Sequence, residues 1–427
     1  MSRYQESEKW LTRAQNSIPL GSQTFSKSRT QYPVGISPLY ISNSDGPYVW
    51  DIDGHRYIDL VSSLASVTLG YKNKGVNAAV RKQLNSGVTF SLPGKLEAEV
   101  AELIQQLVPS AEMVRFGKNG TDATSAAVRL ARAYTGRTKI IVCGYHGWQD
   151  WYIGSTSRNK GVPEAVSNLT LKFTYNDIES FRNIVLQDPD IACVVMEPMN
   201  NQFPNRGFLE EVRTLTRQLG IVLIFDETIT GFRFAPGGAQ ELFDVIPDLS
   251  TFGKGIANGF PLSAVVGKKE IMQEMEHIFF SGTFGGELLS LAAAREVLNK
   301  HLKNQVCEQL YEKGAYLNQN IERLIQDYEL TDYLTLSGHP SWTFLNWKED
   351  KKNSVPEIKT YFLQEMFQRG ILLLNTHNVN TAMKEKHLRK IVSVYETVLP
   401  KLQRNLAQGT LSANLRAKPL QPIFIVR

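Results

Sequence analysis

The chain has 427 residues, of which 42% are hydrophobic and 21% charged, a mix that is typical of globular proteins and argues against intrinsic disorder. Its three cysteines are too few for a disulfide framework or a zinc cluster, and its apolar runs are far shorter than the ~20 residues that cross a bilayer. The net charge of +5 comes from the tail 401–427, which holds five basic residues and no Asp or Glu, and such a tail is more often solvated surface than a nucleic-acid-binding face. We therefore expect a cytoplasmic protein that binds neither membranes nor nucleic acids.

The first predicted element is a hairpin over 47–59, where apolar and polar residues alternate around the turn Asp53-Gly54. An amphipathic helix follows over 94–108 and ends at Pro109. Short apolar runs then alternate with helical segments. The predicted strands lie at 113–116, 139–143, 192–196 and 221–225, and the predicted helices between them at 121–134 and 212–219.

Wholly apolar strands that alternate with helices predict a mostly parallel sheet covered by helices on both faces, an α/β fold. After about residue 315 the pattern changes to a smaller α+β domain. Its predicted strands lie within 337–347 and 371–374, and its last helix over 384–402. We expect residues 1–70 to pack with this small domain, residues 71–315 to form the large domain, and residues 316–427 to form the small one.

A glycine-rich turn from Gly117 to Thr121 joins a predicted strand to a predicted helix. The free amides and the dipole at the start of a helix favour an anion such as phosphate, and the Thr121 hydroxyl adds a donor. An ordinary capped helix after a turn is the alternative interpretation. The P-loop motif is excluded, because no Gly-Lys pair of this chain precedes Ser or Thr.

Asp226 ends a wholly apolar strand, and Lys254 lies between two glycines further along the chain. A buried carboxylate is costly unless it is paired, and a desolvated lysine can lose its proton and attack carbonyl groups. With an anion-binding turn, these are the groups that hold pyridoxal phosphate. A strand-end aspartate and a surface lysine are the alternative.

Six motifs occur in an order that resembles the class III pyridoxal-phosphate aminotransferases of fold type I, from about Pro19 to about Leu402. Within this family the chain is most similar to the glutamate-1-semialdehyde 2,1-aminomutase group. The motifs cover residues 119–124, 144–147, 196–198, 225–233, 247–254 and 282–285.

The resemblance implies a role for each matching residue. Lys254 is the Schiff-base lysine that also shuttles the proton, and Asp226 holds the pyridinium nitrogen. Tyr145 stacks on the cofactor ring, with core packing as its alternative role. The phosphate is cradled by Asn119, Gly120 and Thr121.

Three further matches concern the surroundings of the cofactor. Glu197 is expected near it, with a structural carboxylate as the alternative, and His146 is expected as a packed residue behind the site. Thr283 resembles the family residue that reaches the neighbouring subunit's cofactor, which implies a homodimer.

The chain departs from the aminomutase pattern at the substrate. Lys27 stands in the stretch where the mutase carries an arginine, and an ammonium group cannot form the bidentate fork to a carboxylate. The residues expected to contact substrate are polar or aromatic, namely Lys27, Trp148, Asn200 and His377. They favour a transaminase that moves an amino group from an amino acid such as glutamate to an aldehyde or ketone, for example a sugar derivative in amino-sugar biosynthesis. The aminomutase, a decarboxylase of the same fold and a non-catalytic protein are the alternatives.

Overall fold

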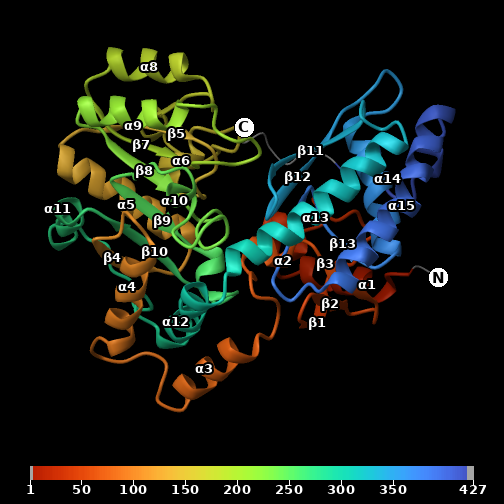
Figure 1. Ribbon diagram of the computed structural model, residues 1–427, viewed down its shortest axis with the longest axis horizontal. Helices are drawn as coiled ribbons and strands as arrows, with labels where there is room; N and C mark the ends of the chain where they lie inside the picture. The colour runs from red at the N-terminus through yellow and green to blue at the C-terminus, as the bar shows by residue number, and fades with distance from the viewer. Residues whose placement is uncertain (1–2, 421–427) are drawn as a thin grey trace. The chain divides into compact units, whose positions relative to one another are not determined.

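The computed structural model describes residues 3–420, which fall into two compact units (Figure 1). The large unit is Lys74–Glu308, and the small unit combines the described residues up to Asn73 with those from Gln309 onward. The domain boundaries expected after residues 70 and 315 stay predictions, and residues 421–427 of the predicted small domain lie outside the described residues. Between residues 3 and 420, no helix is long and apolar enough to cross a membrane.

The large unit is built on one seven-stranded sheet in the order β4-β10-β9-β8-β7-β5-β6. Its strands are β4 (Met113–Gly117), β5 (Lys139–Cys143), β6 (Thr170–Lys172), β7 (Ile191–Met196), β8 (Val222–Asp226), β9 (Leu249–Phe252) and β10 (Ser263–Gly267). Only β10 runs antiparallel to its two neighbours within this sheet. The expected mostly parallel α/β sheet is therefore confirmed.

Helices precede, separate and follow these strands. They are α3 (Lys74–Leu84), α4 (Lys95–Leu107), α5 (Gly120–Thr135), α6 (Asp150–Ile153), α7 (Glu164–Ser167), α8 (Ile178–Gln187), α9 (Phe208–Gln218), α10 (Ala239–Leu242), η3 (Lys254–Ala257), α11 (Lys269–Met272), η4 (Gln273–Glu276) and α12 (Leu288–Lys303). The strands and helices expected from 94 to 225 are all present, with bounds that differ by a few residues.

The sheet is buried on both faces because alternate side chains point to opposite sides. Ile140 and Val142 of β5 join the core under α5, whereas Ile141 between them joins the core under α8 and α9. Figure 1 shows α8 and α9 together on one side of the strands. Because helices cover both faces of the sheet, the side chains on both sides of each strand are buried, and these strands are continuous apolar runs in the sequence.

The small unit holds a four-stranded sheet, β1-β2-β3-β13, and a three-stranded sheet, β11-β12-β14. Its elements are α1 (Gln5–Gln15), η1 (Pro19–Gly21), η2 (Phe25–Lys27), β1 (Ile41–Asp45), β2 (Tyr48–Asp51), β3 (Arg56–Asp59), α2 (Ser62–Ala65), β11 (Leu334–His339), β12 (Trp342–Trp347), α14 (Val355–Gln368), β13 (Ile371–Leu372), β14 (Thr376–Asn378), α15 (Glu385–Gln408) and η5 (Ser412–Asn414). Helix α13 (Val306–Asp327) starts in the large unit and continues into the small one.

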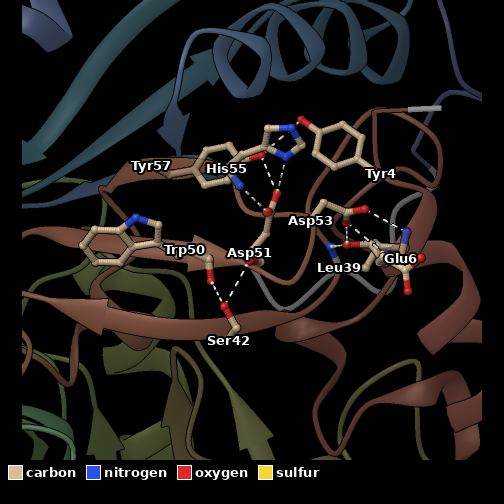
Figure 2. Close-up of polar contacts among 10 residues, drawn as sticks. Tyr4, Glu6, Leu39, Ser42, Trp50, Asp51, Asp53, His55 and Tyr57 are labelled. Atoms are coloured by element: carbon tan, nitrogen blue, oxygen red, sulfur yellow. Dashed lines mark hydrogen bonds and ion pairs between the residues drawn. The ribbon is translucent and has the colours of Figure 1, made fainter. Parts of the chain in front are cut away.

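Of two aspartates in the predicted hairpin, Asp53 joins helix α1 to the hairpin and Asp51 stabilises the hairpin itself (Figure 2). Asp53 accepts hydrogen bonds from the Glu6 and Ser7 amides at 2.7 and 3.0 Å and so holds the start of α1. Asp51 accepts the Tyr57 hydroxyl at 2.8 Å and the His55 amide at 2.7 Å. The parallel pairing of β3 with β13 joins this N-terminal hairpin to the last third of the chain.

Candidate functional site

A cavity of about 230 Å³ lies at the carboxyl edge of the large sheet. It is formed by the turns that directly follow β4, β5, β7, β8 and β9, which is where parallel sheets bind ligands. Its lining includes Asn119, Gly120, Thr121, Tyr145, His146, Gly147, Trp148, Glu197, Asp226, Thr228 and Lys254. The structure thus brings together the sequence-predicted carboxylate, lysine and glycine-rich turn.

Asp226 is buried at the end of β8, and both of its carboxylate oxygens have hydrogen-bond partners. One carboxylate oxygen faces His146 Nδ1 at 2.8 Å, and the other accepts the Thr228 amide at 3.1 Å and the Thr251 hydroxyl at 3.2 Å. Burial by itself would raise the pKa of Asp226, but the hydrogen bond and charge of His146, together with the bond from the Thr228 amide, hold it below its usual value. The site therefore keeps a fixed negative charge at neutral pH.

His146 lies behind Asp226 and is itself held in place by aromatic rings. Its imidazole stacks on Trp151 with a centroid distance of 6.5 Å and meets the edge of Tyr152 at 5.3 Å. The expectation of a packed histidine behind the site agrees with this placement, but the sequence did not reveal its bond to Asp226. The two residues are 80 positions apart, so only the tertiary fold joins them.

The start of α5 presents an anion-binding surface to the cavity. The Asp122 carboxylate accepts the Lys118 and Asn119 amides at 3.0 and 2.7 Å, while the amides of the first helical turn, at Gly120 and Thr121, have no acceptor inside the helix. The hydroxyls of Thr121 and Thr228 are buried without a hydrogen-bond partner. Buried orphan hydroxyls beside a helix N-terminus suit a phosphate group.

Gly147 shapes this cradle by its lack of a side chain. Its φ is +105°, and a Cβ atom there would lie 2.4 Å from the Thr121 hydroxyl oxygen. Sequence analysis did not select Gly147 for the cradle. Gly147 closes the family motif 144–147, but the motif alone does not show which residue the glycine approaches.

Lys254 begins η3 directly after β9 and lines the same cavity as Asp226. Its φ of +41° is left-handed, a conformation that costs energy for any residue with a Cβ atom. Strained backbone of this kind is found where the surrounding fold fixes a functional side chain.

Glu197 organises the turn after β5. Its Oε2 accepts the Tyr145 amide at 3.0 Å and the Asn200 side-chain amide at 2.7 Å. The Tyr145 side chain is 43% exposed, meets Tyr152 edge-on and lines the cavity, and Trp148 is 65% exposed at the same cavity. These placements are compatible with a ring-stacking Tyr145 and with a substrate-facing Trp148.

The other sequence-predicted residues lie elsewhere. Thr283 is exposed in the loop before α12 and is not part of the described lining of this cavity. Lys27 is exposed in the small unit and lines a different cavity of about 500 Å³ there, together with Ser63 and Leu64.

His377 requires a correction. It lies in the small unit, is only 1% exposed, and its Nε2 is 2.7 Å from the Tyr395 hydroxyl. Burial lowers the pKa of His377 to about 4, so the ring is neutral at physiological pH. A side chain enclosed in this way cannot contact a substrate, and we remove His377 from the predicted substrate residues.

The cavity fits pyridoxal phosphate by the chemistry of its own groups. The orphan hydroxyls of Thr121 and Thr228 and the first turn of α5 match a phosphate, and the ionised Asp226 matches a protonated ring nitrogen. Lys254 supplies an amine at the same cavity. Thr228 was missed by sequence analysis, although its position two residues after Asp226 places it at the same strand end.

Comparison with known proteins gives one consistent result. The family profile Aminotransferase class-III matches residues 31–388. The chain is 36% identical over 392 residues to a glutamate-1-semialdehyde 2,1-aminomutase of Citrifermentans bemidjiense, covering 86% of this chain and 91% of that protein. It is 32% identical over 353 residues to a 3-aminobutyryl-CoA aminotransferase of Cloacimonas acidaminovorans, covering 81% and 84%.

A solved structure agrees with these relatives. The FumI protein of Sphingopyxis sp. MTA144, solved in its PLP internal aldimine form, superposes with a TM-score of 0.88 at 26% identity and covers 97% of this chain and 99% of that one. The predicted type I fold of pyridoxal-phosphate enzymes is therefore confirmed.

Proposed function

Because the chain belongs to the class III aminotransferase family, we propose that it transfers an amino group from L-glutamate to an aldehyde or ketone, with a hydroxylated, sugar-like carbonyl compound as acceptor. The enzyme class and the cofactor, pyridoxal phosphate, follow from the family, as the sequence analysis predicted. The observation that carries the proposal is the single cavity that gathers Asp226, Lys254 and the start of α5.

The residues that line the cavity have different roles in this proposal. The first turn of α5 with Thr121 and Thr228 would hold the phosphate, and the ionised Asp226 would hold the ring nitrogen in its protonated form. Pyridoxal phosphate supplies an electron sink that stabilises negative charge on the substrate carbon. Lys254, which lines the same cavity, would hold the cofactor through its amine and would serve as the base that moves the proton at the substrate carbon.

The polar surroundings support a hydroxylated acceptor. Glu197 and Asn200 form a hydrogen-bonded pair beside the cavity, and the exposed indole of Trp148 lies at its lining. Lys27, in the stretch where the resemblance places the mutase arginine, argues against an acceptor held through a bidentate carboxylate fork.

A homodimer in the cytoplasm, with Thr283 reaching the partner's cofactor, completes the proposal. The exposure of Thr283 is compatible with this role. The loop that carries it is anchored near the cofactor turn, because Glu287 forms an ion pair of 3.0 Å with Lys118.

The aminomutase remains the second candidate, since the relative with 36% identity carries that name. The two activities differ in their products. A transaminase converts each glutamate into 2-oxoglutarate, whereas a mutase that moves the amino group within one substrate releases none.

The test is to incubate the holoenzyme with L-glutamate and a series of aldehydes and ketones, and to measure 2-oxoglutarate. We expect its release to depend on the acceptor and to fail in Lys254→Ala. Turnover of glutamate-1-semialdehyde alone, without 2-oxoglutarate, would overturn the proposal in favour of the aminomutase.

A further inference from the structure

A second, larger cavity lies beside the cofactor cavity at the same edge of the large sheet. Its volume is about 520 Å³, and it is formed by the residues that follow β5, β6 and β7. Glu197 lines both cavities, while Gly144 and Tyr145, which are neighbours in the chain, line one each. The two cavities are therefore adjacent at Glu197.

The orientation of Asn200 in this second cavity is fixed by Glu197. A carboxylate only accepts hydrogen bonds, and the Glu197 oxygen 2.7 Å from Asn200 also accepts the Tyr145 amide, so the Asn200 amide must present its NH₂ group there. Its carbonyl oxygen Oδ1 then points away from Glu197. This oxygen is buried and has no partner, and Asn200 as a whole is 7% exposed.

An unpaired buried acceptor is unfavourable and calls for a donor. The same condition holds for the Thr121 and Thr228 hydroxyls, which a cofactor phosphate would satisfy in the first cavity. Asn200 Oδ1 is thus suited to a ligand O–H group.

The rest of the lining combines ring surfaces with polar groups. The hydroxyls of Tyr152 and Tyr175 donate to the Gly144 and Pro198 carbonyls at 2.8 and 2.7 Å, which leaves the rings themselves as apolar surface. Lys172, at the end of β6, is exposed at the cavity, and partial burial lowers its pKa. Ring surface, a fixed amide and an ammonium group suit the C–H faces and hydroxyls of a polyol.

We propose that this cavity binds the polyhydroxylated part of the amino-group acceptor, with a ligand hydroxyl donating to Asn200 Oδ1. The identity of the ligand as an amino-group acceptor rests on the proposed transaminase function. The binding of a polyol in this cavity does not depend on turnover. Binding and reaction can therefore be tested separately.

The binding test uses erythritol, a four-carbon polyol without a carbonyl group, added to the holoenzyme and observed by saturation-transfer NMR. We expect a signal with the wild type and its loss in Asn200→Leu, which has a similar volume but no acceptor. Asn85→Leu is the matched control, because Asn85 is exposed after α3 and lines neither cavity. Lys172→Met, at an exposed position that folding tolerates, is expected to weaken the same signal.

The reaction test compares D-erythrose with butanal, two four-carbon aldehydes that differ in their hydroxyl groups, with glutamate as donor. We expect Asn200→Leu to lower kcat/KM for D-erythrose by about tenfold more than for butanal, the effect of one lost hydrogen bond to a ligand hydroxyl. The ratio of the two kcat/KM values separates this loss from any effect on the Glu197 turn, which would lower both equally.

The outcomes separate the two proposals. No erythritol signal with the wild type, or an equal signal with Asn200→Leu and Lys172→Met, overturns the polyol site. An erythritol signal that depends on Asn200 in an enzyme that does not react with glutamate overturns the transaminase proposal and leaves the polyol site standing.

Discussion

Asp226 shows how one residue obtains its chemical state from its surroundings. Its burial opposes a negative charge, and the imidazole of His146 at 2.8 Å together with Thr228 restores that charge. The linear pattern could single out Asp226 at the end of an apolar strand and Lys254 between two glycines, but their roles followed only from the family resemblance. It could not predict the bond to His146, which depends on how β5 and β8 are placed in one sheet.

This view of Asp226 gives a prediction for His146→Leu. Without the imidazole, burial dominates and the pKa of Asp226 rises, so the carboxylate becomes protonated at a higher pH. We define the acid limit as the pH at which the holoenzyme loses half of its visible cofactor absorption as the pH falls. We expect this acid limit to rise by about 1 pH unit or more in the variant.

The control for this change is His277→Leu, because His277 is exposed and lies outside the cofactor cavity. Its acid limit should equal that of the wild type. An unchanged acid limit in His146→Leu would show that His146 does not set the charge of Asp226.

At the scale of elements, the phosphate cradle depends on the close approach of the turn after β5 to the start of α5. Gly147→Ala would place a methyl group 2.4 Å from the Thr121 hydroxyl oxygen. Strain of roughly 1–3 kcal/mol at this contact corresponds to about a tenfold or greater loss of pyridoxal-phosphate affinity, measured by spectral titration of the apoenzyme.

Gly136→Ala provides the matched comparison for the cradle. Gly136 has a φ of +68° at the end of α5, and a Cβ atom there would meet nothing within 4 Å. Both variants place an alanine at a positive φ and so share that conformational cost, but only Gly147→Ala also adds the contact with Thr121. Equal cofactor affinities in the two variants would contradict the role of the cradle.

Asp248 secures the opposite, amino-terminal edge of the same strands. It forms a bidentate pair with Arg213 at 2.7 and 2.9 Å, an ion pair with Lys268 at 2.7 Å, and accepts the Leu223 amide at 2.9 Å. Burial raises the pKa of Asp248, but these partners outweigh burial and hold it below its usual value. The carboxylate therefore stabilises the fold when ionised.

We expect Asp248→Asn to lower the free energy of unfolding by about 3 kcal/mol at pH 7, because it removes one partner of a buried ion pair. The loss is measured from urea unfolding, with Asp45→Asn at an exposed position as control. The pKa of Asp248 is lower in the folded chain than in the unfolded chain, where it lies near ~3.9. The stability that its ionised form contributes is therefore complete above the unfolded pKa, and it is lost as the pH falls through the folded pKa. The difference between wild type and variant should shrink below about pH 4, and a difference that grows there would contradict this assignment.

Helix α2 shows which elements sequence patterns cannot predict. Residues 62–65 have φ values of 45°, 50°, 60° and 67°, a left-handed turn without a single glycine. It is held by a residue far away in the sequence, Asn378. The side-chain amide of Asn378 donates to the Val61 carbonyl at 2.8 Å, and its main-chain carbonyl accepts the Ser62 hydroxyl at 2.6 Å. By contrast, β5, β7 and β8 were predictable because each is one apolar run buried on both faces.

At the scale of the whole molecule, the proposed homodimer makes each cofactor site depend on two chains. Thr283 lies in an exposed loop outside the described lining of its own chain's cavity. The sequence could suggest this residue only through family resemblance, because a contact between chains leaves no periodic pattern within one chain.

Mixing two defective chains tests this arrangement. We expect Lys254→Ala and Thr283→Ala to be impaired separately, and a refolded mixture to regain roughly a quarter of wild-type activity, because half of the assorted dimers hold one intact site. Activity that never exceeds the average of the two separate variants would show that Thr283 acts within its own chain.

The most direct test of the central claim is the visible spectrum of the holoenzyme during titration with L-glutamate. A cofactor held by Lys254 and charged by Asp226 should absorb near ~420 nm and shift to near ~330 nm as it takes up the amino group. Lys254→Ala should lack this glutamate-dependent shift. A protein that forms no band after reconstitution with pyridoxal phosphate, or a Lys254→Ala variant that shifts with glutamate as the wild type does, would contradict the account.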